Sequence, residues 1–188
     1  METILYIKNM VCDRCIMAVS QILNGLKLHP RSVELGEVQL ADQLSESQRN
    51  QLREALEKMG FELLDDKRQQ TIGQVKSAII KLVHYENDRS DVNLSDYLSE
   101  KLHSDYSALS KLFSEVVGKT IERYYIEQRV ERVKELIKYD QLSLTQIANK
   151  LNYSSVAYLS SQFKSVTGMT PSAFKVRKGN MLKALDKI

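Results

Sequence analysis

Two stretches of the chain follow one pattern: Ser104-Asp-Tyr-Ser-Ala-Leu-Ser-Lys-Leu-Phe113 with Gly118 and Thr120, and Ser154-Ser-Val-Ala-Tyr-Leu-Ser-Ser-Gln-Phe163 with Gly168 and Thr170. When residues 94–126 are aligned with residues 144–176, at an offset of 50, eight positions are identical. The identical pairs are Leu94/Leu144, Ser104/Ser154, Leu109/Leu159, Ser110/Ser160, Phe113/Phe163, Val116/Val166, Gly118/Gly168 and Thr120/Thr170. A repeat of this kind indicates one structural unit that occurs twice.

Each copy predicts two helices joined by a short turn. Before the first helix of the second copy, Ser143 and Gln146 have the capping-box pattern. We expect a serine to cap the second helix of each copy, and a glycine to end it in the left-handed conformation that glycine favours. These positions are Ser104, Ser154, Gly118 and Gly168. Each copy is therefore predicted to be a helix-turn-helix unit.

A long helix is predicted between the two copies, from about Thr120 to Tyr139. Its apolar stripe has the i, i+4, i+7, i+11 spacing of one helical face, at Ile126, Val130, Val133 and Ile137. Such a helix is roughly 30 Å long, and one turn of B-DNA rises about 34 Å. The helix could therefore hold two similar units at the spacing of successive major grooves.

Charge differs between the two halves of the chain. Residues 1–70 contain 9 Lys and Arg against 11 Asp and Glu, whereas residues 71–188 contain 18 against 13. Residues 142–188 contain seven basic side chains and one acidic one, Asp186. This bias favours a polyanionic partner such as nucleic acid. The alternative explanation is a basic face that is only solvated.

Composition and motifs argue against an enzyme and against a membrane protein. The chain has 188 residues, 43% of them hydrophobic, which suits one or two packed domains. It has neither the apolar core of a signal peptide nor a run of about 18 apolar residues, so we expect a cytoplasmic protein. We find no phosphate-binding glycine loop, metal-hydrolase histidine spacing or catalytic carboxylate pair. The three histidines are scattered and are expected to be surface or capping residues: His29, His84 and His103.

The first part of the chain predicts a βαββαβ order. The expected elements are a strand from Thr3 to Lys8, a helix that ends near Gly25, a hairpin over 32–40, a helix from Ser45 to Gly60, and a strand over 61–64. The polar segment that follows has no apolar period and is typical of a linker. We therefore expect four regions: a domain over 1–66, a linker over 67–74, a helical domain over 75–178, and a basic tail over 179–188.

Residues 75–178 resemble the DNA-binding domain of the AraC/XylS family of bacterial transcription regulators. The resemblance is most specific in the second copy, through Leu144-Thr-Gln-Ile-Ala148, Tyr153-Ser154, Tyr158-Leu159-Ser160, Gln162-Phe163-Lys164 and Thr170-Pro171. It implies an all-α domain of about seven helices, whose two recognition helices enter adjacent major grooves. One chain would then contact two half-sites on double-stranded DNA.

The candidate DNA-binding residues are those left on the outer helix faces when the apolar positions are assigned to the core. In the first copy, Leu109, Leu112, Phe113, Val116 and Val117 are expected to point inward. The expected outward residues are Tyr106, Ser107, Ser110 and Lys111 in the first copy, and Ser155, Val156, Ala157, Ser160, Ser161, Gln162 and Lys164 in the second. Lys111 is the strongest candidate for a base contact. The second copy presents mostly small groups, which lack the bidentate reach of arginine or asparagine, so we expect it to position more than it specifies.

The N-terminal part resembles a heavy-metal-associated domain, the ferredoxin-like fold of copper chaperones. The resemblance rests on the strand Ile4-Leu-Tyr-Ile7, on Met10-Val-Cys12-Asp-Arg-Cys15, and on the helix that follows. Asn9 and Val11 replace the glycine and threonine that are usual there. The resemblance implies that Cys12 and Cys15 bind a thiophilic ion such as Cu(I), which thiolates favour.

Three interpretations of the cysteine pair remain open: a thiophilic metal sensor, a thiol–disulfide sensor, and a pair with no ligand. The helix N-terminus and Arg14 predict a lowered pKa for Cys15, and Asp13 opposes this effect. Zinc would need four ligands, and His29 is the only other clear candidate in this part of the sequence, so a zinc site would require a second chain.

The sequence therefore predicts a DNA-binding transcription regulator that senses a metal through its N-terminal domain. RNA polymerase and a second copy of the chain, paired through the N-terminal domain, are further candidate partners, and no membrane partner is expected. The alternative is a metal-handling chaperone or thiol-redox protein whose helical half binds another protein.

Overall fold

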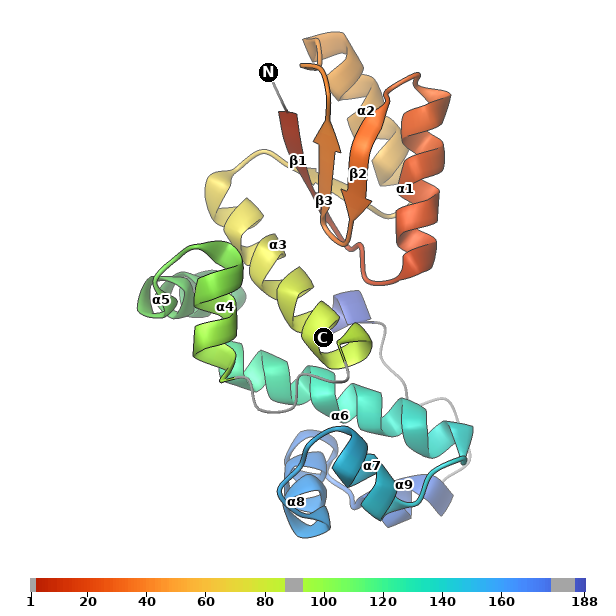
Figure 1. The fold of residues 1–188 in the computed structure, drawn as a ribbon, viewed down its shortest axis with the longest axis vertical. Coiled ribbons are helices and arrows are strands. Elements are labelled where there is room, and N and C mark those ends of the chain that lie inside the picture. The colour runs from red at the N-terminus through yellow and green to blue at the C-terminus, as the bar shows by residue number, and fades with distance from the viewer. Residues whose placement is uncertain (1–2, 87–92, 177–184) are drawn as a thin grey trace. The chain divides into compact units, whose positions relative to one another are not determined.

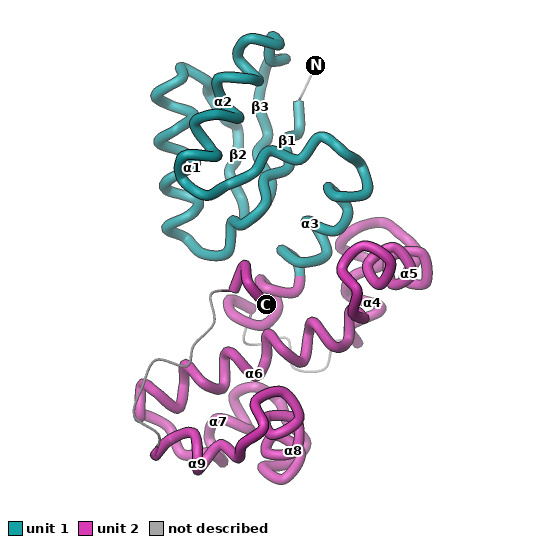
Figure 2. Tube along the Cα trace, turned by 180° about the vertical axis from the view of Figure 1, so that it is seen from behind, with its two compact units in different colours: residues 1–78 teal, residues 79–188 magenta. Residues whose placement is uncertain are grey.

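The computed structural model describes residues 3–86, 93–176 and 185–188, and it divides the chain into two compact units, Met1–Ala78 and Ile79–Ile188 (Figure 2). Most of the expected basic tail, 179–188, lies outside the described residues. No helix within the described ranges is both long and apolar enough to cross a membrane.

Unit 1 has the predicted βαββαβ order (Figure 1). Its elements are β1 (Thr3–Lys8), α1 (Asp13–Gly25), β2 (Pro30–Glu34), β3 (Glu37–Leu40), α2 (Glu46–Lys58) and β4 (Glu62–Leu64). The strands form one antiparallel sheet in the order β2-β3-β1-β4. Strands β2 and β4 are therefore the two edges of this sheet.

The core of unit 1 follows from the alternation of its strands. Leu5 and Ile7 of β1 are buried, and Val38 beside them on β3 is fully buried. Helices α1 and α2 lie over one face of the sheet (Figure 1), with the apolar side chains Val19, Leu23, Leu52 and Leu56 fully buried. This is the two-layer arrangement that the period-2 strands and period-3.6 helices predict.

The segment 67–74, which the sequence suggests is a linker, differs from that expectation because it is helical. It is the first part of α3 (Lys67–Ile80). The Asp66 carboxylate accepts hydrogen bonds from the backbone N–H groups of Arg68 (2.8 Å) and Gln69 (3.0 Å), which is an N-cap arrangement. The first turn of α3 is polar, so it has no apolar period that would indicate a helix. The apolar residues of α3, Ile72 and Val75, come later and are buried.

Unit 2 contains the two predicted helix-turn-helix units joined by one long helix (Figure 1). After α3 comes one turn of π-helix, η1 (Lys81–Tyr85). The first unit is α4 (Leu94–Leu102) and α5 (Tyr106–Val117), the connecting helix is α6 (Ile121–Tyr139), and the second unit is α7 (Leu144–Lys150) and α8 (Val156–Thr167). Helix α9 (Pro171–Val176) and the 3-10 turn η2 (Leu185–Lys187) follow.

Both helix-turn-helix units pack against α6. In the first, the rings of Phe113 on α5 and Tyr124 on α6 lie 5.6 Å apart and both are buried. In the second, Phe163 at the matching position packs against Phe174 of α9 at 5.5 Å. The second core consists of Val130, Val133, Leu136, Ile137, Ile147, Ala148, Tyr153, Leu159, Phe163 and Phe174.

The helix ends confirm the predicted glycines but shift the predicted serine caps by one residue. Gly118 (φ 77°) and Gly168 (φ 79°) end α5 and α8 in the left-handed conformation. The N-caps are Asp105, which accepts from the Ala108 N–H at 3.1 Å, and Ser155, which accepts from the Tyr158 N–H at 3.0 Å. Ser104 and Ser154 were the wrong assignments, because a cap must directly precede the first helical residue for its oxygen to reach the third N–H.

The interior of unit 2 contains a polar network that includes His84, which was wrongly expected to be a surface or capping residue. Its Nε2 lies 3.2 Å from Oε1 of the buried Gln128, whose Nε2 donates to the Tyr124 hydroxyl at 3.0 Å. The other ring nitrogen lies 3.8 Å from the Glu135 carboxylate. Burial lowers the pKa of His84, against the effect of Glu135. His84 is therefore held mainly in the neutral form.

We expect the stability of unit 2 to fall in mild acid because of His84. A histidine whose folded pKa lies below its unfolded value, about 6.5, favours the folded state above that value, and the benefit is lost as the pH falls through the folded pKa. The melting temperature of the wild type should therefore drop more steeply between about pH 7 and pH 5 than that of the His84→Gln variant. Equal slopes for the wild type and the His84→Gln variant would contradict the assignment.

The N-cap assignment makes a second prediction. Ser155→Ala should lower the free energy of unfolding by about 1 kcal/mol, the usual value of an N-cap serine, and Ser155→Asp should retain it. The matched control is Ser154→Ala, one residue earlier, which should change stability much less. Chemical denaturation of the three variants measures this, and a larger loss for Ser154→Ala would restore the original assignment.

Candidate nucleic-acid interface

The candidate interface consists of the outward faces of α5 and α8, the second helices of the two units. Both helices have 12 residues, an N-cap whose side chain accepts from the third helical N–H, and a glycine at the end. Their buried residues also match, Leu109 and Phe113 on α5 with Leu159 and Phe163 on α8. The two helices are therefore closely matched scaffolds that differ in their exposed and half-buried side chains.

On α5, two of the four predicted contact residues are exposed, Ser107 and Lys111. The Ser107 hydroxyl donates to the Asp105 carboxylate, so it also supports the cap. Lys111 lies opposite the buried Leu109 and Phe113 on the helix and is the basic residue of this face. Val116, expected in the core, is 36% exposed because it lies in the last turn of α5.

The other two predicted residues of α5, Tyr106 and Ser110, are half-buried. The Tyr106 hydroxyl donates to the carboxylate of Glu122 on α6. Burial and this carboxylate raise the pKa of Tyr106, while the same hydrogen bond lowers the pKa of Glu122. Tyr106 therefore links α5 to α6, and its hydroxyl is engaged in a hydrogen bond within the protein.

On α8, the exposed members of the predicted set are Ser155, Ala157, Ser161 and Lys164. The Ser155 hydroxyl is the N-cap described above, and Ser160 is half-buried. Val156 was wrongly predicted to face outward: it is half-buried and packs against the second core, because the first turn of α8 rests on that core.

Tyr158 is an exposed aromatic residue on α8 that the sequence analysis did not include among the contact residues. Its side chain is 49% exposed, and its hydroxyl accepts a hydrogen bond from Nε2 of the half-buried Gln162 at 2.9 Å. Gln162, predicted to contact DNA, is thus engaged with Tyr158. The repeat could have indicated Tyr158 as an outward residue, because it aligns with Ala108 at the offset of 50, and both residues are exposed.

Aromatic and cationic contacts hold the Tyr158 ring in place on its inner side. Its ring meets the ring of Tyr153 edge-on, with centroids 6.1 Å apart. The guanidinium of Arg129, on α6, lies 3.9 Å from the centre of the Tyr153 ring and donates to the Leu151 carbonyl at 2.6 Å. Burial raises the pKa of Tyr153 to about 12, so this ring stays neutral. The chain Arg129–Tyr153–Tyr158 thus fixes the exposed ring to the connecting helix.

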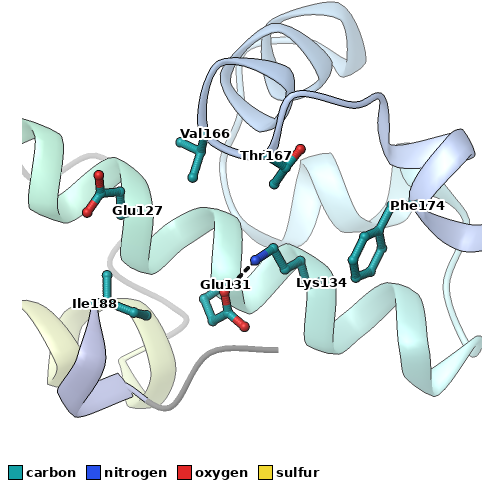
Figure 3. A pocket seen from close by; sticks show the side chains of 7 residues that line it. All are labelled: Glu127, Glu131, Lys134, Val166, Thr167, Phe174 and Ile188. Atoms are coloured by element: carbon teal, nitrogen blue, oxygen red, sulfur yellow. Dashed lines mark hydrogen bonds and ion pairs between the residues drawn. The ribbon is translucent and has the colours of Figure 1, made fainter. Parts of the chain in front are cut away.

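A cavity of about 270 Å³ lies on the inner side of the second unit and is not part of this interface (Figure 3). Val166 and Thr167 from the inner side of α8 line it, with Phe174 of α9. From α6, Glu131 and Lys134 face it and form a buried ion pair of 2.8 Å. A cavity on this side cannot contact a partner that binds the outward face of α8.

Unit 1 contains a second candidate site, at Cys12 and Cys15. Cys12 is the N-cap residue of α1, Cys15 lies in its first turn, and both are free thiols with their Sγ atoms 3.3 Å apart. Asn9, in place of the usual glycine, has a left-handed backbone (φ 72°), which asparagine tolerates, and its amide donates to the Gly60 carbonyl at 3.0 Å. The substitution is therefore compatible with a tight loop.

The pKa expected for Cys15 was wrong in direction. Burial raises the pKa of this thiol, and backbone hydrogen bonds offset the effect only in part. Over the described ranges, His, Cys, Asp and Glu side chains form no group of three or more that could hold a metal ion.

The comparisons with known proteins concern mainly the C-terminal part. Residues 98–177 match the model of a family described as a helix-turn-helix domain. The chain is 29% identical over 104 residues to the Msm operon regulatory protein of Streptococcus mutans, which is 55% of this chain and 35% of that protein. It is 27% identical over 99 residues to the xylose operon regulatory protein of Haemophilus influenzae, which is 52% of this chain and 26% of that protein.

The fold resembles the C-terminal domain of AraT, a response regulator from Geobacillus stearothermophilus, with a TM-score of 0.51 and 21% identity over 63% of this chain and 94% of that one. This chain spans about a third or less of the length of the two curated relatives described above. Both curated relatives are described as operon regulatory proteins. Residues 98–177 are thus similar to a helix-turn-helix domain, which agrees with the sequence resemblance described for this part of the chain.

Proposed function

We propose that the chain is a sequence-specific, double-stranded-DNA-binding transcription regulator, in which α5 and α8 enter two adjacent major grooves. The observation that carries this proposal is the presence of two closely matched helix scaffolds with exposed polar faces, both packed on one connecting helix. Helix α6 has 19 residues, so it is roughly 28 Å long, close to the rise of one turn of B-DNA. The operon-regulatory relatives support the same conclusion.

The two faces would make different contributions to DNA binding. Lys111 is at the centre of the α5 face, where an ammonium can donate to the acceptors of guanine. Lys164 is exposed nearer the end of α8, where a phosphate contact is the simpler use of a lysine. A regulator of operons acts at promoters, which makes RNA polymerase a further partner in this proposal.

We also infer that unit 1 is a ferredoxin-like, heavy-metal-associated domain that senses a thiophilic ion. The βαββαβ order, the strand order β2-β3-β1-β4 and the two thiols 3.3 Å apart support this inference. Cys12 and Cys15 would hold the ion as thiolates. The edge strands β2 and β4 would let a second copy pair with this domain, since an edge presents unpaired backbone groups.

Binding to DNA should separate the roles of the two lysines. Lys111→Ala should reduce discrimination at one half-site by about 1–3 kcal/mol, whereas Lys164→Ala should weaken binding to all sequences and reduce the salt slope by about 1. Lys58→Ala, an exposed lysine of unit 1, is the control and should bind like the wild type. The measurement is a gel-shift titration at several salt concentrations, on a duplex selected from random sequences.

Two outcomes of this titration count against the proposal. If the wild type shows no salt-sensitive binding to any duplex, the chain is not a DNA-binding regulator and the helical half is better explained as a protein-interaction module. If Lys111→Ala and Lys164→Ala change affinity and specificity in the same way, the division of roles is wrong.

Metal binding by unit 1 should depend on both cysteines. Anaerobic titration with Cu(I) against a competing chelator should give about one ion per chain for the wild type, because two thiolates suit this ion. The Cys12→Ser/Cys15→Ser variant should lose this binding, and Met17→Leu, which removes an exposed thioether of α1, should keep it. Because the pKa of Cys15 is raised, affinity should increase with pH. Indistinguishable curves for the wild type and the double variant would remove the metal hypothesis.

A further inference from the structure

We propose that α8 reads the 5-methyl groups of thymine through Ala157 and the ring of Tyr158, so that the two half-sites differ in chemistry. The proposal rests on the DNA-binding function proposed above and specifies what the second unit recognises. It changes the expectation that this unit positions the protein on DNA more than it specifies the sequence.

The N-terminal half of the outward face of α8 has no side chain that can make bidentate hydrogen bonds to a base; the basic residue of the face, Lys164, lies nearer the C-terminal end of the helix. Helical spacing from the buried Leu159 and Phe163 gives an outward face of Ala157, Tyr158, Ser161, Lys164 and Ser165, all exposed. The helix contains neither arginine nor asparagine. Its one glutamine, Gln162, is half-buried, its Nε2 is bonded to Tyr158, and its Oε1 is buried without a hydrogen-bond partner. The N-terminal half of this face therefore offers none of the usual bidentate pairs for guanine or adenine.

The same face offers a rigid apolar surface instead. The Ala157 methyl group and the Tyr158 ring belong to adjacent exposed residues in the first turn of α8, the part of a recognition helix that contacts base edges. The Tyr158 ring is held by Gln162 at its hydroxyl and by Tyr153 at its edge, and Arg129 fixes Tyr153 to α6. An aromatic ring fixed in this way loses little conformational entropy on binding. The apolar group that the major groove presents is the thymine methyl.

Helix α5 differs at the matching positions. Ala108 is found where α8 has Tyr158, and Lys111 where α8 has Ser161. A lysine at the centre of the face suits the O6 and N7 acceptors of guanine. The half-site under α5 is therefore expected to contain guanine, and the half-site under α8 to contain thymine.

The test replaces thymine by deoxyuridine in the selected duplex, one half-site at a time. This exchange removes only the methyl group and keeps every hydrogen-bonding group of the base pair. In one half-site it should weaken binding of the full-length chain about three- to fivefold per methyl, the effect of losing one buried methyl group, and in the other it should change binding less than about twofold. Titrations at fixed salt measure both.

Variants then assign the effect to α8. Tyr158→Ala should bind the thymine duplex more weakly and should respond less to deoxyuridine, whereas Tyr158→Phe, which keeps the ring, should respond like the wild type. Ala108→Gly, at the matching position of α5, should leave the response unchanged. Circular dichroism of each variant checks that it is folded.

Each remaining outcome has one meaning. A selected duplex without thymine in either half-site, no response to deoxyuridine, or the same response in the wild type and Tyr158→Ala would overturn the inference while leaving DNA binding intact. The absence of binding to any duplex would instead contradict the proposed function itself.

Discussion

The packing of apolar side chains onto helix α6 is the interaction on which the rest of unit 2 depends. This one helix contributes Ile121 and Tyr124 near its start, and Val130, Val133 and Ile137 further along, and all five are buried. Tyr124 packs against Phe113 of α5, and Val130, Val133 and Ile137 belong to the core that contains Phe163 of α8. Neither helix-turn-helix unit could bury its apolar face without α6, because a pair of short helices has too little core of its own.

Polar groups buried on α6 add specificity to this packing. Gln128 is fully buried and bonds to both His84 and Tyr124, and Glu131 pairs with Lys134. Buried polar groups contribute little net stability compared with apolar ones, but each is costly if its partner is lost. They therefore favour one rotation of α6 about its axis, and that rotation fixes which way α5 and α8 face.

The sequence predicts the scaffold better than the contact surface, for a physical reason. Apolar residues indicate which face of a helix is buried, and the repeated glycines indicate where a helix ends. Both signals come from the residues of the helix itself, so the sequence predicts the positions of α5, α6 and α8 almost to the residue. The side chains on the surface depend on details of packing instead. Val156 packs inward because of where the first turn of α8 rests, and Tyr158 gains its role from contacts with Gln162 and Tyr153. The polar first turn of α3 and the buried His84 were missed for the same reason, since each polar group is satisfied by a partner that its own sequence neighbours do not reveal.

The matched lengths of α5 and α8, combined with their unmatched faces, would give a complex of the proposed kind with DNA a direction. A protein with two identical readers related by symmetry binds a palindrome equally well in either orientation. Here the two helices belong to one chain and present different side chains. Lys111 of α5 corresponds to Ser161 of α8, and Tyr158 of α8 corresponds to Ala108 of α5. A single copy would then distinguish upstream from downstream on an asymmetric site, without needing a partner subunit to do so.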